Sequence, residues 1–501
     1  MKGNNKAAIK SNIATSDFSQ KASRHDLNHD DSIPLNSFFK DTFEDETKLL
    51  EIEGKVCSYG DTVHYAKNPK FFTKSLGSYL YDSKEKPYLD LQMWHSVANL
   101  GYANKRVNDA VKDQIDKLPQ VPSQFLHYEK VKLAQAIAES VEGRFGLKGR
   151  VHFNVGGAQA IEDALKLVRR NTGKQHMFAF EGGYHGRTIG ASAITSSYRY
   201  REPFGEFADR ADFIPYPYSF RCPIGSTDEN ACEDYYVNFF ERKFEHEYAG
   251  VWNPKTNKCE FGAFFLEPVQ GTGGYIVPPK NYFKRIEKIC REHGILIVVD
   301  EIHMGFYRTG KLWSIEHFGI KPDIIVFGKA LTNGLNPLSG FWAREELITP
   351  EIFGPGSTHS TYSSNSIGTA AGLEVMKIFS EKDYSKIVLE KGDYFLKLLK
   401  RLQLKYPEIG HVGGLGLALR VELCELDGFT PNRKLAEDIF RFGLDDQIKI
   451  DGKEVGLILA LGGYYKNVLT LAPSLEITYK EMDLAHDILD ILITKAKTKP
   501  I

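Results

Sequence analysis

An aspartate and a lysine each follow an apolar run that is rich in β-branched residues. The run 295–299 ends at Asp300, and the run 324–327 ends at Gly328 and Lys329. Such runs are typical of strands that are buried on both faces of a parallel sheet. Because ligands of open α/β sheets bind beyond the carboxyl ends of the strands, the acid and the amine are predicted to lie at the same sheet edge.

This pair of side chains suits pyridoxal phosphate (PLP). A lysine holds the aldehyde as a Schiff base, and an aspartate keeps the pyridine nitrogen protonated so that the ring can take up electrons. Asp300 and Lys329 could instead form a salt bridge or an exposed rim, and two residues alone do not separate these interpretations.

Composition excludes several other classes of protein. The chain has 501 residues, 42% hydrophobic and 26% charged, which is typical of a globular protein with more than one domain. A net charge of -1 and the lack of a long apolar run argue against nucleic acid and membrane partners.

The six cysteines lack CxxC spacing, so we expect reduced thiols, a cytoplasmic location and no metal site. Cys222 and Cys232 flank one loop and could pair or bind a metal, although unpaired cysteines are favoured.

Four segments are expected along the chain. Residues 1–40 are polar and are predicted to form a flexible arm. Three lysines precede the first acid, as in some transit peptides, but arginines are few and we keep the cytoplasmic prediction. Residues 41–95 and 381–501 are predicted to contribute the two parts of a small domain, and residues 96–380 a large cofactor-binding domain.

A strand, a glycine pair and a helix form a candidate anion site. The strand 150–154 is followed by Gly156 and Gly157, and residues 158–170 have helical spacing. Backbone N–H groups point outward at a helix start, and glycine lets a phosphate approach them, although a glycine pair is also ordinary turn chemistry. No lysine of the Walker A type follows, which disfavours a nucleotide.

Two further strands end in functional groups. After the strand 175–180, Tyr184 or His185 could lie flat on a cofactor ring, and the strand 261–266 stops at Glu267. Several strands are therefore followed by polar or aromatic residues at the same edge of the predicted sheet. Independent chance placement does not readily account for this pattern.

The N-terminal part shows a hairpin, a loop and a helix. Residues 78–82 and 88–91 have the pattern of paired strands, and residues 107–115 have helical spacing. Between them lie Trp94 and His95, which could have a structural role or could contact a substrate.

Four motifs together identify a family. They are FEGGYHGRT at 180–188, EPVQG at 267–271, DEIHMGFYRTG at 300–310 and PDIIVFGKA at 322–330. From about residue 45 to its end the chain resembles the class III (ω-type) aminotransferases of PLP fold type I. The resemblance implies an α/β fold. It has a large domain on a mostly parallel seven-stranded-type sheet and a smaller α+β domain from the N- and C-terminal segments.

The resemblance assigns roles to five residues. Lys329 corresponds to the Schiff-base lysine that later carries the proton shift, which needs the neutral amine. Asp300 corresponds to the partner of the pyridinium nitrogen. Ile302 would press on one ring face and Tyr184 would stack on the other. Glu267 matches a glutamate near the substrate.

The resemblance also implies a homodimer with shared active sites. Gly157 and Ala158 correspond to the phosphate loop, and Thr361 corresponds to a residue that reaches the phosphate from the neighbouring subunit.

Three positions depart from the family pattern. His303 replaces a glutamine but could still donate to the phenolic oxygen of the cofactor. Ala158 replaces Ser or Thr, which removes a hydroxyl donor. Thr470 replaces the carboxylate-binding arginine of members that use 2-oxoglutarate, so the clamp must come from elsewhere. Arg187, Arg420 and, in the N-terminal loop, Trp94 are candidate substrate contacts.

Three functions remain open. The leading hypothesis is a ping-pong aminotransferase, which moves the amino group of a terminal-amine donor such as lysine, ornithine or 4-aminobutyrate to an oxo acid. The second is an amino-acid racemase or epimerase on the same fold. The third is a binding protein that has lost catalysis, against which the retention of Lys329 and Asp300 argues.

Overall fold

The computed structural model describes residues 45–60, 64, 69–205, 207, 211–445 and 448–498. The chain divides into two compact units, residues 1–63 and 64–501. In the first unit the described helix is α1 (Glu46–Val56), which begins where the Asp45 side chain accepts a hydrogen bond from the backbone N–H of Thr47. The predicted arm, 1–40, lies outside the described residues. The division of the rest into large and small domains stays a prediction.

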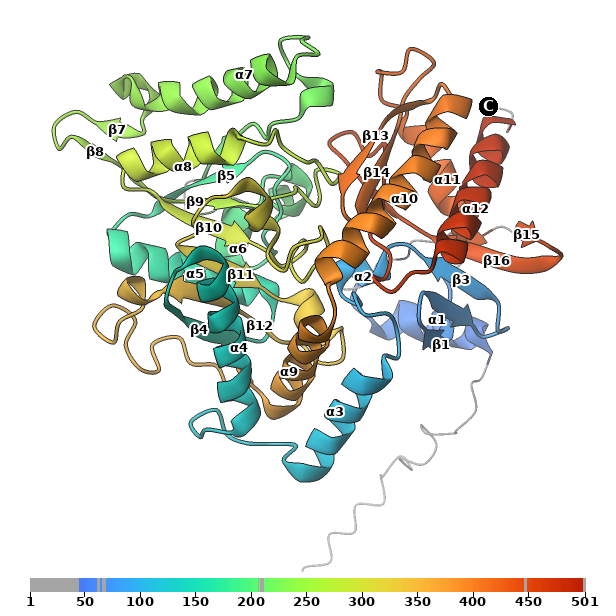
Figure 1. Cartoon of the computed structure of the whole chain (residues 1–501), viewed down its shortest axis with the longest axis horizontal. Coiled ribbons are helices and arrows are strands. Elements are labelled where there is room, and N and C mark those ends of the chain that lie inside the picture. The colour runs from blue at the N-terminus through green and yellow to red at the C-terminus, as the bar shows by residue number, and fades with distance from the viewer. Residues whose placement is uncertain are drawn as a thin grey trace, which may run out of the picture. The chain divides into compact units, whose positions relative to one another are not determined.

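A seven-stranded sheet forms the centre of the second unit (Figure 1). All neighbouring strands pair in parallel except β12, which runs antiparallel to both of its neighbours. The sheet is therefore mostly parallel, as predicted. In spatial order its strands are β4 (Gly149–Asn154), β12 (Ser339–Arg344), β11 (Ile324–Phe327), β10 (Leu296–Asp300), β9 (Phe261–Leu266), β5 (His176–Phe180) and β6 (Ala211–Ile214).

The inner strands are apolar on both faces because helices cover both faces. Val298 packs in the same cluster as Ile161 of α5 (Gly157–Thr172), whereas its neighbour Val299 packs in the cluster that contains Phe240 of α7 and Ile286 of α8. Helices α7 (Glu229–Glu241) and α8 (Tyr282–Glu292) thus cover one face and α5 the other (Figure 1). This double burial explains the continuous apolar runs in the sequence.

Two smaller sheets are built from the chain ends of the second unit. In the five-stranded sheet, β3 pairs in parallel with β16, so N-terminal and C-terminal segments share one sheet. The predicted hairpin is present as β2 and β3. The strands of the five-stranded sheet are, in order, β1 (Phe72–Leu76), β2 (Tyr79–Asp82), β3 (Pro87–Asp90), β16 (Lys453–Ile458) and β15 (Ile448–Ile450). Those of the four-stranded sheet are β13 (Ile409–Leu415), β14 (Ala418–Leu423), β18 (Val468–Leu471) and β17 (Ala460–Gly462).

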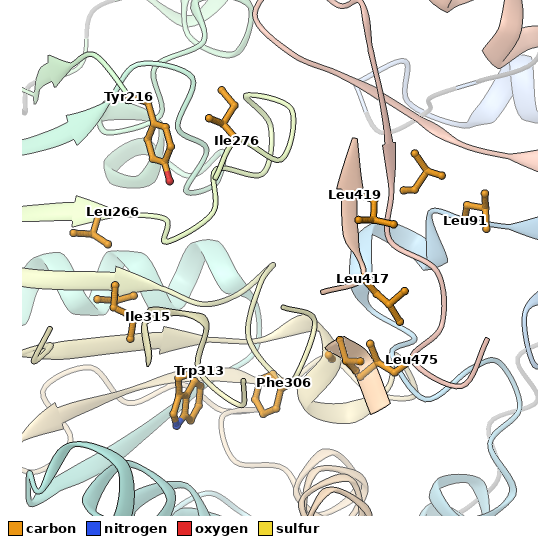
Figure 2. Packing of buried hydrophobic residues seen from close by; sticks show 14 of the residues in the cluster. Leu91, Tyr216, Leu266, Ile276, Phe306, Trp313, Ile315, Leu417, Leu419 and Leu475 are labelled. Carbon is orange, nitrogen blue, oxygen red and sulfur yellow. The ribbon is translucent and has the colours of Figure 1, made fainter. Parts of the chain in front are cut away.

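One hydrophobic cluster joins the large sheet to these smaller sheets. Figure 2 shows Leu266 and Trp313 beside the large sheet, and Leu419 and Leu91 beside the C-terminal and N-terminal strands. The remaining longer helices are α3 (Lys105–Lys117), α4 (Tyr128–Phe145), α9 (Ser366–Glu381), α10 (Tyr384–Lys405), α11 (Arg433–Asp445) and α12 (Tyr479–Thr498). The shorter elements are α2 (Met93–Ser96), α6 (Ile189–Ala193), β7 (Trp252–Asn253) and β8 (Lys258–Cys259).

The described residues contain neither a helix suited to crossing a membrane nor a cluster suited to a metal ion. No described helix combines the length and the apolar character that crossing a bilayer requires. No group of three or more His, Cys, Asp or Glu side chains in this part of the chain is arranged to hold a metal ion.

Candidate active site

Asp300 and Lys329 lie at the same edge of the large sheet. Strands β10 and β11 run in parallel with Asp300 opposite Val326, and Lys329 follows two residues after the end of β11. Lys329 begins a short 3-10 helix, Lys329–Thr332, and has a φ of 42°. A non-glycine residue in the left-handed region is under backbone strain, and such strain is concentrated at functional sites.

The surroundings of Lys329 favour its neutral amine. Burial lowers the pKa of Lys329, against the opposing attraction of the Asp300 and Glu267 carboxylates. Because only the neutral amine attacks a carbonyl carbon, this environment raises the fraction of Lys329 that can act as a nucleophile or base.

Asp300 is held by a histidine and a backbone amide. His185 Nδ1 lies 2.8 Å from Asp300 Oδ2, and the Ile302 N–H donates to Oδ1 at 3.0 Å. Both side chains are buried. Burial works against a charged His185 ring, but the hydrogen bond and charge of Asp300, with the charge of Glu267, outweigh it and raise the pKa of His185. His185 therefore orients and charge-balances Asp300.

Glu267 is a buried carboxyl group whose oxygens both accept backbone hydrogen bonds. The Tyr184 N–H donates to Oε1 at 3.0 Å and the Gly271 N–H to Oε2 at 2.9 Å. Burial and the nearby Asp300 carboxylate raise the pKa of Glu267 to about 7, although His185 and the two amides oppose this shift. A group that titrates near neutral pH beside a neutral amine is suited to moving protons.

The start of α5 forms a cradle for an anion. Its N-cap residue, Gly156, has no side chain to occupy the first amides of this 16-residue helix. A Cβ atom on Gly157 would lie 3.0 Å from Ile302 Cδ1, and one on Gly186 would lie 2.6 Å from Ala158 Cβ. The helix start, Ile302 and the loop that carries Tyr184 and His185 are therefore packed closely together. Free amides, small residues and an apolar side chain fit the phosphate and ring of PLP.

His303 is a neutral neighbour of Lys329. Its Nε2 lies 3.1 Å from the Tyr275 hydroxyl. Burial is the main cause that lowers the pKa of His303 well below its usual range, and the buried Arg308 guanidinium adds to it. This direction favours the neutral ring, which can donate one hydrogen bond and accept another.

Trp94 lies in a turn of unusual backbone conformation. Met93, Trp94, His95 and Ser96 have φ values of 46°, 54°, 56° and 63°, so four consecutive non-glycine residues are left-handed. The buried Asp90 carboxylate anchors this turn by accepting the N–H groups of Gln92 and Met93 at 2.7 and 2.9 Å. Left-handed residues cost about 1–2 kcal/mol each, so the turn is under considerable strain.

The turn places its residues beside the segment that begins with Lys329. Trp94 is 59% exposed, and its ring lies within 3.3 Å of the position that a Cβ on Gly334 would occupy. Burial lowers the pKa of His95 to about 4, so this half-buried ring is neutral. The sequence offers no signal for a left-handed turn here, because neither Trp nor His is typical of that conformation.

The other predicted substrate contacts are less closely associated with Lys329. The Arg187 guanidinium is exposed and lies 4.5 Å from the centre of the Tyr200 ring. Arg420 is buried on β14, where its Nη2 donates to the Glu422 carboxylate and the Tyr218 hydroxyl. Thr361 is exposed on the surface of this chain.

Three residues were not recognised in the sequence. Tyr275 contacts His303, and the Tyr464 hydroxyl donates to Gln270 Oε1 at 3.1 Å, while Gln270 Nε2 donates to the Glu181 carbonyl at 2.7 Å. Gln270 lies in the EPVQG motif, which was a usable signal, whereas Tyr464 comes from a hairpin almost two hundred residues away and carried none.

Comparison with known proteins identifies the class to which this fold and site belong. Residues 62–493 match the model of the Aminotransferase class-III family, and the chain belongs to that family. It is therefore a PLP-dependent enzyme of the class III aminotransferases, as the four motifs indicated.

Individual relatives carry different activities in their names. The chain is 33% identical to a leucine/methionine racemase of Thermococcus litoralis, with 88% of this chain and 94% of that protein aligned. It is 32% identical to the 5-aminovalerate aminotransferase DavT of Pseudomonas putida, with 81% and 88% aligned. A PLP-bound amine transaminase from an uncultivated Pseudomonas species superimposes with a TM-score of 0.75 at 25% identity, over 88% of this chain and 97% of that chain.

Proposed function

We propose that the protein transfers the amino group of a terminal-amine donor to an oxo acid. The observation that carries this proposal is the buried Lys329 amine at the end of two parallel strands, in the field of Asp300 and Glu267. A neutral lysine beside two carboxyl groups of different environment can bind a carbonyl carbon and then move a proton.

The cofactor would be held by residues from three elements. Asp300 would bind the ring nitrogen, and Ile302 and Tyr184 would lie on the two faces of the ring. The α5 start at Gly157 and Ala158 would bind the phosphate. Bound PLP supplies an aldehyde for the amine and a ring that takes up electrons.

The side chains of this chain divide the proton transfers between them. Lys329 Nζ would remove the proton from the carbon that bears the amino group. His185 keeps Asp300 oriented through the 2.8 Å hydrogen bond while charge develops. Glu267, with a pKa of about 7, can release or take up a proton at neutral pH, and His303 can donate to the phenolic oxygen of the cofactor.

The choice of donor rests on the named relatives. DavT is named for 5-aminovalerate, and relatives from Escherichia coli and Exiguobacterium are named as 4-aminobutyrate and ornithine aminotransferases. Each of these compounds carries an amine on a terminal carbon. A small amine and an oxo acid are accordingly the proposed substrates.

A racemase or epimerase is the second candidate. It is favoured by the leucine/methionine racemase of Thermococcus litoralis, which is 33% identical to this chain and is aligned over 94% of its own length. Racemisation returns the proton to the carbon that lost it, whereas amino transfer does not. Both reactions need Lys329 and Asp300.

We also propose that the enzyme works as a homodimer. Phe125, Leu126, Tyr128 and Tyr362 are each more than 60% exposed on the described chain. Their two segments are joined by hydrogen bonds, including one of 3.0 Å from His127 Nε2 to the Ser364 carbonyl. A second copy of this chain would bury this apolar surface, which includes the neighbour of Thr361, and would bring Thr361 towards the partner's cofactor.

The cysteines support a proposal for the compartment. All six are unpaired in the structure, and five of them are buried. Unpaired thiols suit a reducing compartment, so a cytoplasmic location is proposed.

The visible spectrum of the holoenzyme tests the function. Single additions of lysine, ornithine, 4-aminobutyrate, 5-aminovalerate and several neutral amino acids would be recorded. If a terminal amine bleaches the band of the lysine-bound cofactor and an oxo acid restores it, amino transfer is supported and the donor is identified. If an amino acid loses optical activity without bleaching the band, the racemase is correct and the proposed transfer is wrong.

A further inference from the structure

The loop after β5, which carries His185, is bound by two consecutive hydroxyl residues. The Thr195 Oγ1 atom accepts the His185 N–H at 2.9 Å, and the Ser196 Oγ atom accepts the Gly182 N–H at 2.6 Å. The Ser196 N–H in turn donates to the Gly183 carbonyl at 3.1 Å. Both hydroxyl residues come just after the end of α6, so one short segment binds this loop at three points.

The Thr195 hydroxyl is fully buried and uses both its donor and an acceptor site. Besides accepting from His185, Oγ1 lies 2.9 Å from the Ala191 carbonyl and 3.1 Å from the Gly186 carbonyl, and it can donate its proton to either. Because His185 is also buried, water does not replace this acceptor if it is removed. Loss of the Thr195 hydroxyl would therefore leave the buried His185 N–H unpaired, which is costly.

The backbone of His185 is bound by Thr195, while its ring is bound by Asp300. His185 Nδ1 lies 2.8 Å from Asp300 Oδ2, and both side chains are buried. A hydrogen bond weakens steeply as its angle departs from linearity. The position of the His185 backbone therefore decides how well the ring can orient the Asp300 carboxylate.

Close packing beside His185 makes the position of the loop exacting. Gly186 has a φ of 134°, a conformation that favours glycine, and a Cβ atom on it would lie 2.6 Å from Ala158 Cβ and 3.0 Å from Ala191 Cβ. The loop thus passes between the start of α5 and α6, in contact with both. Thr195 joins the loop to the α6 side of this contact by hydrogen bonds.

We propose that Thr195 is a positioning residue of the active site. It holds the His185 backbone so that the His185 ring binds Asp300 and the preceding residue, Tyr184, faces the cofactor ring. Ser196 does the same for the first part of the loop. This inference rests on the proposed cofactor site, because Thr195 acts through His185 and Asp300.

The chain offers a matched control in Thr172, at the opposite end of α5 from the anion cradle. Thr172 Oγ1 donates to the Val168 carbonyl, four residues earlier, at 2.8 Å and accepts the Lys174 N–H at 3.2 Å. Thr195 has the same pair of bonds, to the carbonyl four residues earlier and from the His185 N–H. Valine keeps the shape of threonine without its hydroxyl, so the two Thr→Val variants lose the same kinds of bond in different places.

Two properties of the holoenzyme test the assignment without turnover. One is the dissociation constant of PLP, measured from its release on dilution. The other is the visible ellipticity per bound PLP, which reports how the site orients an achiral, planar ring. Thr195→Val should weaken PLP binding roughly fivefold to thirtyfold and lower the ellipticity, since a buried donor is left unpaired. Thr172→Val should change neither, and Thr195→Ser, which keeps the hydroxyl, should restore both.

A Thr195→Val variant with the PLP affinity and ellipticity of the wild type would show that Thr195 is only structural. If Thr195→Val does not fold, Ser196→Ala gives the same comparison, because it removes one acceptor at the part-buried Gly182. Ser196→Ala should lower the ellipticity by a smaller amount, and an unchanged value would overturn the inference. Failure of every amine to bleach the visible band would instead refute the proposed function and leave the Thr195 result valid.

Discussion

Replacement of Glu267 by glutamine tests whether the environment of this carboxyl group is as the structure describes. The folded state raises its pKa from an ordinary 4.5 to about 7. Between these values the folded protein binds more protons at this group than the unfolded chain does. Stability is therefore gained at low pH and lost as the pH rises from 4.5 towards 7, and it changes no further above that value.

The size of this effect follows from the shift. A shift of about 2.5 units at about 1.36 kcal/mol per unit gives a contribution of about 3 kcal/mol across this range. Glutamine does not titrate, so Glu267→Gln removes the pH-dependent part. It also adds a constant cost, because the Tyr184 and Gly271 amides need two acceptors and glutamine offers one oxygen. An unsatisfied buried donor costs about 1–3 kcal/mol.

Urea unfolding of both proteins at several pH values between 4.5 and 8 measures these quantities. Protein and PLP concentrations must be fixed, since ligand binding changes apparent stability. We expect the stability advantage of the wild type to shrink by about 3 kcal/mol as the pH rises through this range. Parallel curves for the two proteins would refute the argument, because they would mean that Glu267 titrates normally in the folded protein.

Further predictions concern the cofactor site. Lys329→Ala should remove the visible band of the bound cofactor and lower turnover by roughly a thousandfold or more, and an active variant would exclude Lys329 as the reacting amine. Asp300→Asn should still bind PLP but lose roughly a hundredfold in kcat, since the ring nitrogen loses its charged partner; unchanged kcat would argue against that pairing. Ala158→Ser should tighten PLP binding by roughly threefold to tenfold in fluorescence titrations, because a hydroxyl is added at the α5 start. Weaker PLP binding by this variant would count against the phosphate assignment.

The large sheet and its catalytic edge were predictable because they depend on local pattern. A strand that is buried on both faces must be apolar at every position, so Asp300 and Lys329 mark the points at which two strands end. The glycine pair at the start of α5 could be recognised in the same way, because only small residues allow close approach, and its role in binding an anion stays a prediction.

Other features depend on contacts between distant segments, which periodicity does not record. The pairing of His185 with Asp300 spans 115 residues, and nothing in either segment distinguishes it from stacking on a ring. The left-handed turn at Trp94 goes against the preference of its own residues, and Leu91, which shortly precedes it, is held by the Ile458 carbonyl, which accepts its N–H at 2.9 Å. The position of Arg420 opposite Thr470 became visible only when the strand register was known.

The parallel pairing of β3 with β16 has a consequence for synthesis of the enzyme. Asp90 of β3 pairs with Ile458 of β16, and 458 − 90 = 368 residues separate them in the chain. Strand β3 is therefore synthesised early and cannot form this pairing until these residues have been added. At about 5–20 residues per second this wait lasts roughly 20–70 seconds. The strained turn that follows β3 depends on this pairing, because β3 carries the Asp90 carboxylate that anchors the turn. The region around Trp94 and His95 should therefore mature only near the end of translation, and nascent chains that stop before β16 should be chaperone clients that lack a working site.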